Sequence, residues 1–270
     1  MDQRTDPHVP TQTVTLASGA EMPMLGFGTW QIRGREATTA TAAALAAGYR
    51  HVDTATVYGN EGEVGEGLRA SGVAREEVFL TTKFPPNAAG SEMDTLRRSL
   101  DLLGTEYVDL WLIHWPGERG ANLTIWETFA QAQQAGLVRD IGVSNFDVEL
   151  VDELTKVIGT SPAVNQIEWS PFLFDARTLE DHSARRIAVE GYSALRGGTL
   201  DNPVIVDIAR RLGRTTAQVI VRWHLQHGVI VIPKSRNEER IRSNADVDDF
   251  ALSEQDMAAI DALGRRGHRG

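Results

Sequence analysis

Short apolar runs alternate along the chain with longer segments in which apolar residues recur at helical spacing. Two predicted strands, at residues 80–83 and 108–114, each end on a polar residue. The longer segments each run into a glycine, the residue that most often ends a helix. Such segments span residues 37–47, 91–103, 124–135 and 203–212. Strands that alternate with helices favour a parallel sheet covered by helices, so the chain is predicted to be an α/β protein, a (β/α)8 TIM barrel.

The start of the chain breaks this alternation. Residues 14–16 and 21–24 have the pattern of two short strands joined by a Ser-Gly turn, which predicts a β-hairpin ahead of the barrel. We expect this hairpin to close the floor of the barrel. The 270 residues fit one barrel of about 250 residues and no linker interrupts the pattern, so residues 1–270 are predicted to form a single domain. Residues 1–12 and 265–270 are expected to be flexible.

Composition narrows the classes of partner and location. A net charge of −10 argues against nucleic acid and against an anionic membrane as general partners, although a local basic site for one phosphate is compatible with it. The chain has no cysteine, which removes disulfides, thiolate catalysis and sulfur-based zinc sites. No signal peptide and no membrane-spanning run is visible. We expect a cytoplasmic protein, monomeric or weakly associating, that uses no metal.

Four polar residues in the first half of the chain, Asp53, Tyr58, Lys83 and His114, lie at or just past the ends of predicted strands. Because the carboxyl ends of all strands in a parallel barrel open onto one face, these residues are expected to share a pocket. The set suits carbonyl reduction. A carbonyl that accepts hydride needs a proton at its oxygen, which Tyr58 can supply if the Lys83 ammonium lowers its pKa. Asp53 would orient Lys83, and a neutral His114 would donate to the substrate oxygen or share the proton with Tyr58.

Two glycine clusters match nucleotide-binding loops only in part. Gly26 and Gly28 lack the third glycine of a dinucleotide fingerprint, so a Rossmann fold is rejected. The glycines between residues 59 and 67 lack the lysine of a phosphate-binding loop. They predict a turn followed by a loosely packed helix start.

The strings around these strand ends resemble the aldo-keto reductase superfamily, and most closely its bacterial 2,5-diketo-D-gluconate reductase type. The resemblance covers residues 14–263. It rests on the string around Asp53 and Tyr58, the Thr-Lys that ends at Lys83, and the His-Trp-Pro that begins at His114. The resemblance implies a catalytic tetrad with Tyr58 as general acid, Lys83 and Asp53 tuning it, and His114 orienting the carbonyl.

Polar and aromatic side chains at later strand ends are candidates for holding a nicotinamide. In the proteins that this chain resembles, the positions of Ser144, Asn145 and Gln166 bind the carboxamide, and that of Tyr192 stacks its ring on the nicotinamide. Gly28 and Thr29, at the end of the first barrel strand, are also assigned to the cofactor. The cofactor residues assigned so far are therefore Gly28, Thr29, Ser144, Asn145, Gln166 and Tyr192.

A basic cluster follows the last apolar run. Lys234 and Ser235 come to the start of a short helical segment whose N–H groups favour an anion, and Arg240 adds a second cation. The cluster resembles the family's site for the adenosine 2′-phosphate, which implies NADPH rather than NADH, with Asn244 at the adenine. Arg236 stands where relatives often carry a small or apolar residue. It either strengthens the phosphate site or points to solvent.

Aromatic residues near strand ends are candidates for the substrate wall, namely Trp30, Phe84 and Trp115. Many relatives have a tryptophan soon after the catalytic lysine, where this chain has Phe84, so the wall is expected to differ. Trp169 either narrows the pocket or packs beneath it. The long carboxyl-terminal loop that shapes substrate choice in larger relatives is not expected here, which favours relaxed specificity toward small aldehydes and ketones.

The sequence therefore predicts NADPH-dependent reduction of small-molecule aldehydes or ketones to alcohols. Two other classes stay open. A nicotinamide-binding sensor or regulatory protein would keep the cofactor residues with little turnover, and the intact tetrad argues against it. A metal-dependent barrel hydrolase would use strand-end His and Asp with a divalent ion, and the lack of a His-x-His pair on an early strand argues against that.

Overall fold

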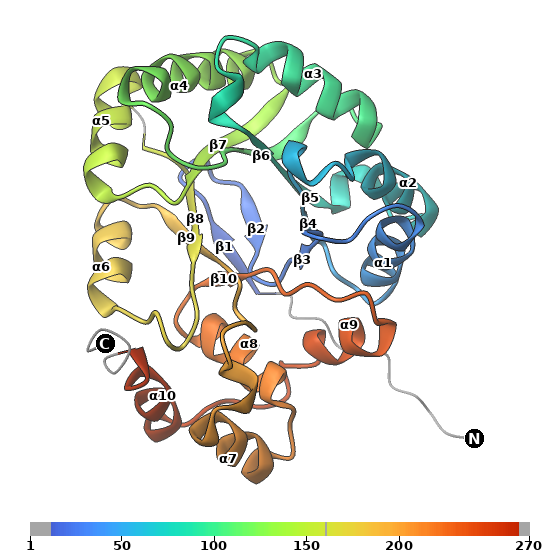
Figure 1. Ribbon diagram of the computed structural model, residues 1–270, viewed down its shortest axis with the longest axis vertical. Coiled ribbons are helices and arrows are strands. Elements are labelled where there is room, and N and C mark those ends of the chain that lie inside the picture. The colour runs from blue at the N-terminus through green and yellow to red at the C-terminus, as the bar shows by residue number, and fades with distance from the viewer. Residues whose placement is uncertain (1–11, 160, 265–270) are drawn as a thin grey trace.

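The computed structural model describes residues 12–159 and 161–264. Eight parallel strands form one sheet in the order β10-β9-β8-β7-β6-β5-β4-β3, so each strand pairs with its neighbours in the chain (Figure 1). A parallel bridge between Leu25 and Val231 joins the two edges of the sheet, and the predicted barrel is confirmed. Its strands are β3 (Phe27–Gly28), β4 (His51–Asp53), β5 (Phe79–Phe84), β6 (Val108–Ile113), β7 (Val138–Ser144), β8 (Val164–Glu168), β9 (Ala188–Tyr192) and β10 (Ile230–Val231).

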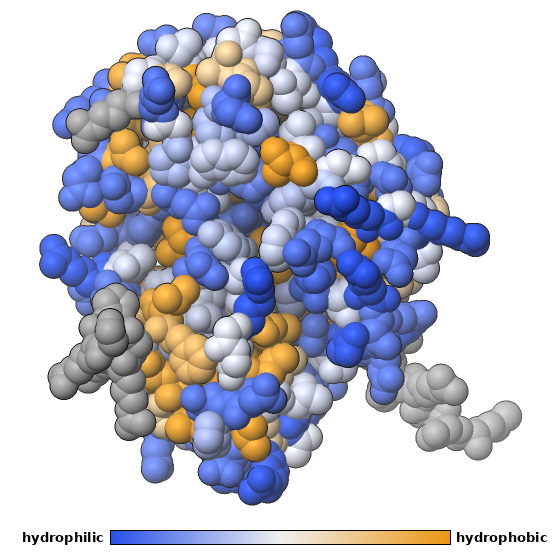
Figure 2. Space-filling model, in the orientation of Figure 1, coloured by the Kyte–Doolittle hydropathy of each residue, from blue (hydrophilic) through white to orange (hydrophobic). Residues whose placement is uncertain are grey.

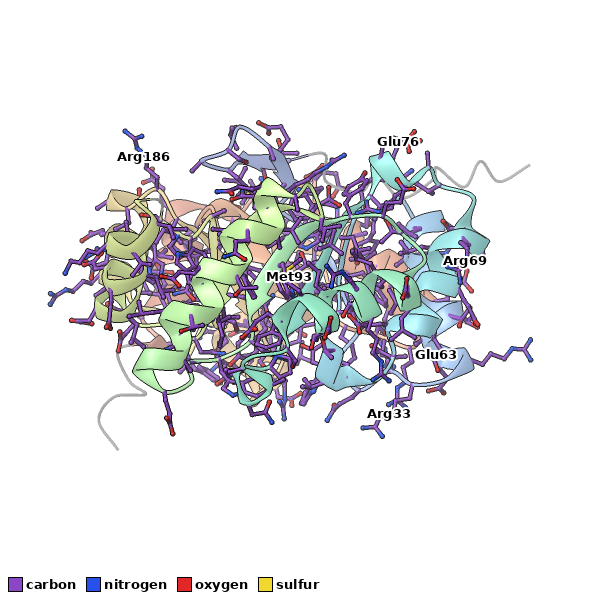
Figure 3. The ribbon with its side chains drawn as sticks, turned by 90° about the horizontal axis from the view of Figure 1, so that it is seen from above. Arg33, Glu63, Arg69, Glu76, Met93 and Arg186 are labelled. Atoms are coloured by element: carbon purple, nitrogen blue, oxygen red, sulfur yellow. The ribbon has the colours of Figure 1, made fainter. Side chains whose placement is uncertain are left out.

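The hairpin predicted ahead of the barrel is present. Its strands β1 (Thr13–Thr15) and β2 (Glu21–Pro23) pair antiparallel, and the Ser18 hydroxyl between them donates to the Asp140 carboxylate of β7 at 2.9 Å. Figure 3 shows the hairpin at the same end of the barrel as Arg186, where loops enter the strands. The hairpin therefore covers the amino-terminal floor of the barrel. The flexible ends predicted at 1–12 and 265–270 lie, except for residue 12, outside the described residues.

Helices follow the strands and surround the barrel, as the alternation predicts (Figure 1). Gly104 and Gly213 end two of them in the left-handed conformation, with φ of 69° and 66°. One helix begins at Arg119, ahead of the predicted start at residue 124, because its first turn is polar and carries no apolar periodicity. The helices are α1 (Arg35–Ala46), α2 (Glu61–Ser71), α3 (Glu92–Leu103), α4 (Arg119–Gln134), α5 (Val148–Ile158), α6 (Ala176–Ala184), α7 (Pro203–Leu212), α8 (Thr216–Gln226), α9 (Glu238–Ala245) and α10 (Glu254–Asp261), with short 3-10 turns η1 (Thr56–Tyr58), η2 (Arg75–Glu77), η3 (Pro86–Ala88) and η4 (Thr199–Asp201).

The glycines of α2 allow close packing of helices. A Cβ at Gly65 would lie 2.5 Å from the backbone oxygen of Leu103 in α3, and a Cβ at Gly67 would lie 2.7 Å from that of Thr38 in α1. Only a residue without a side chain lets α2 come this near to both neighbours. The predicted loose packing is found at Gly62, where a Cβ would meet only Leu102 Cδ2 at 3.8 Å, but not at Gly65 and Gly67.

The pleat of the strands sorts side chains into two layers. In β6, Leu112 faces the barrel interior, whereas Trp111 faces the helices and stacks on Phe129 of α4 with ring centroids 3.7 Å apart. The interior becomes polar toward the carboxyl ends of the strands. The buried polar side chains gathered there are His51, Asp53, Thr81, Lys83, Gln166 and Glu190.

The carboxyl ends of the strands face the viewer in Figures 1 and 2. Figure 2 shows a mainly hydrophilic outline on this face, with apolar residues most concentrated in the lower part of the view, around α8. No helix within residues 12–159 and 161–264 is long and apolar enough to cross a membrane.

Candidate active site

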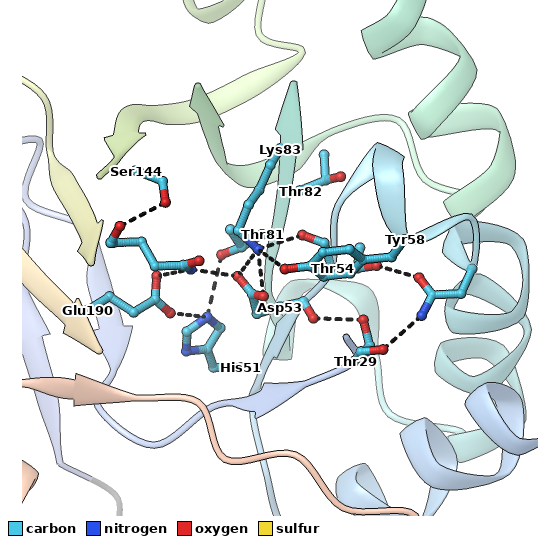
Figure 4. A network of polar contacts seen from close by, with 12 residues as sticks. Thr29, His51, Asp53, Thr54, Tyr58, Thr81, Thr82, Lys83, Ser144 and Glu190 are labelled. Atoms are coloured by element: carbon cyan, nitrogen blue, oxygen red, sulfur yellow. Dashed lines mark hydrogen bonds and ion pairs between the residues drawn. The ribbon is translucent and has the colours of Figure 1, made fainter. Parts of the chain in front are cut away.

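The four predicted catalytic residues converge at the carboxyl end of the barrel. Asp53 is the last residue of β4, Lys83 lies near the end of β5, and His114 directly follows β6. Tyr58 ends η1, the short turn of helix that follows β4. Figure 4 shows Asp53, Lys83 and Tyr58 within one network of polar contacts. The structure thus brings together residues that the sequence carries on separate strands.

Lys83 and Asp53 form a buried ion pair. The Lys83 ammonium donates to both carboxylate oxygens of Asp53, at 2.6 and 2.7 Å, and to the backbone oxygen of Thr54 at 2.9 Å. Both side chains are almost completely shielded from solvent. Burial alone would lower the pKa of Lys83, but the Asp53 carboxylate and other nearby groups outweigh it and raise the pKa, so the lysine stays charged.

Tyr58 holds its proton more firmly than the sequence predicts. Its hydroxyl lies 3.4 Å from Lys83 Nζ. That charge acts to lower the pKa of Tyr58, but burial is the larger influence, and together with the Asp53 carboxylate it raises the pKa above the usual value of 10.0. The predicted depression is therefore not found. A phenol that keeps its proton at neutral pH is suited to give one, which is what carbonyl reduction requires.

His114 is a neutral imidazole beside Tyr58. Burial, and to a lesser degree the Lys83 ammonium, lower the pKa of His114 to about 3. The rings of His114 and Tyr58 meet edge to face with centroids 5.7 Å apart. A neutral ring in this position can donate an N–H to a substrate oxygen that also meets the Tyr58 hydroxyl.

A cavity of about 520 Å³ lies at this end of the barrel, and its lining includes Asp53, Tyr58 and His114. Trp30 and Trp115, the predicted wall residues, also line it and keep 39% and 37% of their surfaces exposed. The volume and the mixture of aromatic walls with a few polar groups suit a small-molecule ligand.

Phe84 and Trp169 lie outside the cavity lining. Phe84 is fully buried between the strands and the helices and packs edge-on against Trp111. The pleat explains the difference from the prediction, because Phe84 follows the inward-facing Lys83 and must point outward. Trp169 is buried and stacks on Trp223 of α8 with ring centroids 6.5 Å apart, so it packs against the helices and does not narrow the pocket.

The residues predicted to bind nicotinamide form one hydrogen-bonded group in the cavity wall. The Tyr192 hydroxyl donates to Asn145 Oδ1 at 2.8 Å, and Asn145 Nδ2 donates to Ser144 Oγ at 3.0 Å. Ser144 Oγ in turn donates to the backbone oxygen of Gln166 at 2.8 Å. These contacts link the ends of β7, β8 and β9 and fix the side chains relative to one another.

Gly28 and Thr29, the cofactor residues predicted at the first barrel strand, differ in placement. Gly28 lines the cavity, and a Cβ there would lie 2.7 Å from the backbone oxygen of Ile232, so this position admits no side chain. Thr29 is fully buried, and its hydroxyl donates to the backbone oxygen of Asp53 at 2.9 Å. Thr29, which was predicted to bind the cofactor, therefore supports the end of β4 and is not part of the cavity lining.

Three cations face one another near the predicted phosphate site. Lys234 lines the cavity, and its pKa is lowered by burial and then by the charges of Arg236 and Arg196. Arg196 also lines the cavity, with its guanidinium 5.1 Å from the ring centroid of Trp30. Arg196 was not predicted from the sequence, because it lies in the loop after β9, away from any strand end or helix start.

The Arg236 side chain is about half exposed, and two contacts hold it in place. One guanidinium nitrogen donates to the backbone oxygen of Gln31 at 2.5 Å, and the other pairs with Glu36 at 3.4 Å. Arg236 thus ties the loop after β10 to the loop after β3, on the same side of the barrel as Lys234.

The remaining residues of the basic cluster lie beyond the cavity lining. Ser235 accepts a hydrogen bond from the Asn237 backbone N–H at 3.1 Å and so shapes the chain just before α9. Arg240 is exposed in the first turn of α9, and Asn244 is buried near its end. These side chains reach a ligand only if it extends out of the cavity along the start of α9.

Two buried residues beneath the tetrad were not singled out by the sequence. Glu190 in β9 accepts from Gln166 Nε2 at 2.8 Å, and His51 in β4 lies with Nε2 3.5 Å from Glu190 Oε1. Burial, followed by the Asp53 carboxylate, raises the pKa of Glu190 to about 8, and burial lowers the pKa of His51 to about 4. The available signal was one carboxylate inside an apolar run, and barrel closure is needed to see that it faces inward.

Comparison with known proteins points to one family. Residues 24–265 match the Aldo/keto reductase family. An aldo-keto reductase of Mycobacterium sp. (strain KMS) is 45% identical over 254 residues, which cover 93% of this chain and 92% of the relative. Glyoxal reductase of Bacillus subtilis is 44% identical over 257 residues, which cover 94% and 93%. The crystal structure of an aldo/keto reductase from Brucella melitensis gives a TM-score of 0.91 at 43% identity, covering 94% of this chain and 99% of that one. The chain belongs to the aldo/keto reductase family.

Proposed function

We propose that the protein reduces aldehydes or ketones to alcohols with NADPH, and that Tyr58 is the general acid. Membership of the aldo/keto reductase family supports an oxidoreductase that acts on carbonyls. One observation carries the finer proposal: Tyr58, in the cavity lining, keeps its proton with its hydroxyl 3.4 Å from the buried Lys83 ammonium.

Each residue of the tetrad has its own role in protonating the carbonyl oxygen. NADPH, when bound, supplies the hydride that the carbonyl carbon accepts. As the C=O π bond breaks, its electron pair goes to the oxygen, which takes the proton of Tyr58 and a hydrogen bond from neutral His114. The Lys83 ammonium stabilises the phenolate left on Tyr58, and Asp53 holds that ammonium in place. The alcohol and NADP+ result, and Tyr58 regains a proton from solvent.

The side chains in the cavity wall fit a nicotinamide carboxamide. Gln166 donates its NH2 to carboxylates on the protein side, and no donor within the described residues is bonded to its side-chain carbonyl. Asn145 keeps one Nδ2 hydrogen beyond its bond to Ser144. The two groups complement the NH2 and the C=O of a carboxamide, and the half-buried ring of Tyr192 offers a surface for stacking.

We assign the adenosine 2′-phosphate to the cations around Lys234. Lys234→Ala should weaken NADPH binding by about tenfold or more, because one charge-assisted contact is lost, and should leave NADH binding nearly unchanged. Fluorescence titration of both cofactors measures this, with Lys156→Ala on α5 as the control for loss of a lysine. Equal losses for NADPH and NADH at Lys234 would mean that the phosphate binds elsewhere.

We propose small aldehydes and ketones as substrates, with glyoxal the first to test. A relative named Glyoxal reductase is 44% identical, and another, named for reduction of 9,11-endoperoxide prostaglandin H2, is also 44% identical. The test is the fall in NADPH absorbance with glyoxal and with an activated aromatic aldehyde. Oxidation with either supports a carbonyl reductase. No oxidation with a panel of carbonyls, while NADPH still binds, would favour a nicotinamide-binding sensor.

The cytoplasmic location, the monomeric state and independence from metal stay predictions. Within the described part of the chain, no group of three or more His, Asp or Glu side chains is arranged to hold a metal ion. Full activity in the presence of a strong chelator would support independence from metal. Light scattering at the mass of one chain, 29.6 kDa, would support a monomer.

A further inference from the structure

Beneath the tetrad lies a buried pair, Glu190 and His51, that the proposed reduction does not use (Figure 4). Glu190 Oε2 accepts from Gln166 Nε2 at 2.8 Å. Glu190 Oε1 receives no hydrogen bond from the described residues and lies 3.5 Å from His51 Nε2. A buried carboxyl oxygen without a donor is costly as an anion, but it costs much less when it carries a proton itself.

The contacts of Gln166 favour a neutral Glu190. Gln166 Nε2 also donates to Asp53 Oδ2 at 2.8 Å, so two carboxyl groups meet at one amide. They repel each other when both are charged, and the Lys83 ammonium pairs with Asp53 and not with Glu190. The raised pKa of Glu190 and the lowered pKa of His51, both caused first by burial, agree that the proton of the pair is on Glu190. Its O–H then points toward the unprotonated Nε2 of His51.

The same contacts fix which way the Gln166 amide faces. Asp53 Oδ2 and Glu190 Oε2 are both acceptors, so the NH2 of Gln166 must face them. Its carbonyl oxygen is then directed away from them, toward the cavity that Gln166 lines. Asp53 accepts one hydrogen bond from Gln166 whether or not Glu190 is protonated. With that contact alone, however, the Gln166 amide could rotate.

We propose that Glu190 is a positioning residue: as a neutral carboxylic acid between His51 and Gln166, it holds the Gln166 amide with its carbonyl toward the nicotinamide carboxamide. This inference rests on the proposed use of a nicotinamide cofactor. It assigns a role to a side chain that touches neither substrate nor cofactor. Loss of Glu190 should therefore affect cofactor binding through Gln166 and by no separate route.

A double-mutant cycle tests that dependence. Glu190→Leu removes the acceptor, and Gln166→Leu removes the amide that it positions. Glu190→Leu should weaken NADPH binding by about tenfold in the wild-type background, but by less than about twofold in the Gln166→Leu background. The dissociation constants come from NADPH fluorescence titration of the full chain. Glu190→Met, with a more adaptable side chain, takes the place of Glu190→Leu if the leucine variant does not fold.

Glu190→Gln is the conservative variant, because a carboxamide offers one acceptor and a donor, as a neutral carboxylic acid does. It should bind NADPH within about twofold of the wild type. Asp140→Asn is the matched control: Asp140 is a buried strand carboxyl too, but it is bonded to Ser18 at the opposite end of the barrel. It should leave NADPH affinity unchanged.

Equal losses from Glu190→Leu in both backgrounds would overturn the inference, and so would a Glu190→Gln variant that binds as weakly as Glu190→Leu. A wild type that binds neither NADPH nor NADH would instead overturn the proposed function. A loss confined to the background that retains Gln166, together with recovery in Glu190→Gln, would establish Glu190 as the residue that orients Gln166.

Discussion

The ion pair of Lys83 with Asp53 sets both the charge and the geometry of the site. Lys83 Nζ bonds to both Asp53 oxygens and to the Thr54 backbone, and it still lies within 3.4 Å of the Tyr58 hydroxyl. A buried ammonium held in this way cannot turn away from Tyr58 without losing its other partners. In the proposed mechanism, the position of the charge that stabilises a Tyr58 phenolate is therefore fixed before a substrate arrives.

Lys83→Met should lower the free energy of unfolding by about 3–5 kcal/mol, because the Asp53 carboxylate would stay buried without its cation. Urea unfolding measures the change. Arg97→Met is the control, since it breaks an exposed ion pair with Asp94 and should cost less than about 1 kcal/mol. A loss at Lys83 no larger than the loss at Arg97 would contradict the buried pair.

Phe84→Ala should affect mainly the stability of the protein, whereas Trp115→Ala should affect mainly substrate binding. Phe84 is fully buried, so its loss should cost about 3–5 kcal/mol of stability. Trp115 is 37% exposed in the cavity lining, so its loss should raise KM for a carbonyl substrate with less than about 1 kcal/mol of destabilisation. Urea unfolding and steady-state kinetics measure the two effects. A larger KM change for Phe84→Ala than for Trp115→Ala would reverse this assignment.

At the scale of elements, the packing of α2 against its neighbours rests on Gly65. Gly65→Ala should destabilise the protein by about 1–3 kcal/mol, because the new Cβ would meet backbone oxygens of Leu102 and Leu103 at 2.7 and 2.5 Å. Gly62→Ala in the same helix is the control. Its Cβ would meet only Leu102 Cδ2, at 3.8 Å, so it should gain up to about 1 kcal/mol from helix propensity. Urea unfolding compares the two variants. A change of the same sign in the free energy of unfolding of both would contradict the close packing at Gly65.

The elements that define the fold are visible in the sequence, because alternation and glycine endings are local signals. The convergence of Asp53, Lys83 and His114 was predictable for the same reason, since these residues lie at or just past the ends of predicted strands. The direction of a side chain was harder to predict. Phe84 directly follows Lys83 and faces the helices, and only the register of β5 in the closed barrel decides which of the two points inward.

The buried part of the site could not be predicted from the sequence, because its residues meet only in the closed barrel. Glu190 and His51 are far apart in sequence, and nothing near either residue indicates the other. They meet because the side chains of His51 in β4 and Glu190 in β9 both point into the barrel at the same depth. The raised pKa of Tyr58 was unpredictable for a similar reason, since it depends on how completely the ring is buried.

At the scale of the whole molecule, three histidines make stability sensitive to acid: His51 and His224 are fully buried, and His114 is half-buried. Burial is the largest cause of lowered pKa values in His51 and His224, to about 4, and in His114, to about 3. Unfolded histidines titrate near 6.5, so below that pH the unfolded chain binds more protons than the folded protein. This part of the stability is complete above about pH 6.5 and is lost as the pH falls toward 4. Glu190 acts in the opposite sense, since its raised pKa gives stability that is complete below about 4.5 and lost as the pH rises through 8.

The melting temperature should therefore fall as the pH decreases from 6.5 to 4, and scanning calorimetry in buffers of constant ionic strength measures it. His224 lies outside the cavity lining, and its Nδ1 bonds to the Ile220 backbone oxygen at 2.8 Å. His224→Gln should make the dependence on pH shallower, because one proton fewer is taken up on unfolding. An unchanged slope in that variant would contradict the role of buried histidines.

The central claim is that Tyr58 gives the proton to the carbonyl oxygen, and the rate of a single turnover of bound NADPH in Tyr58→Phe tests it most directly. The variant keeps the ring and loses only the hydroxyl. With the best carbonyl substrate of the wild type, hydride transfer should be slower by about 10³-fold, while the NADPH dissociation constant stays within about twofold. A variant that turns over within about tenfold of the wild-type rate would show that another group supplies the proton.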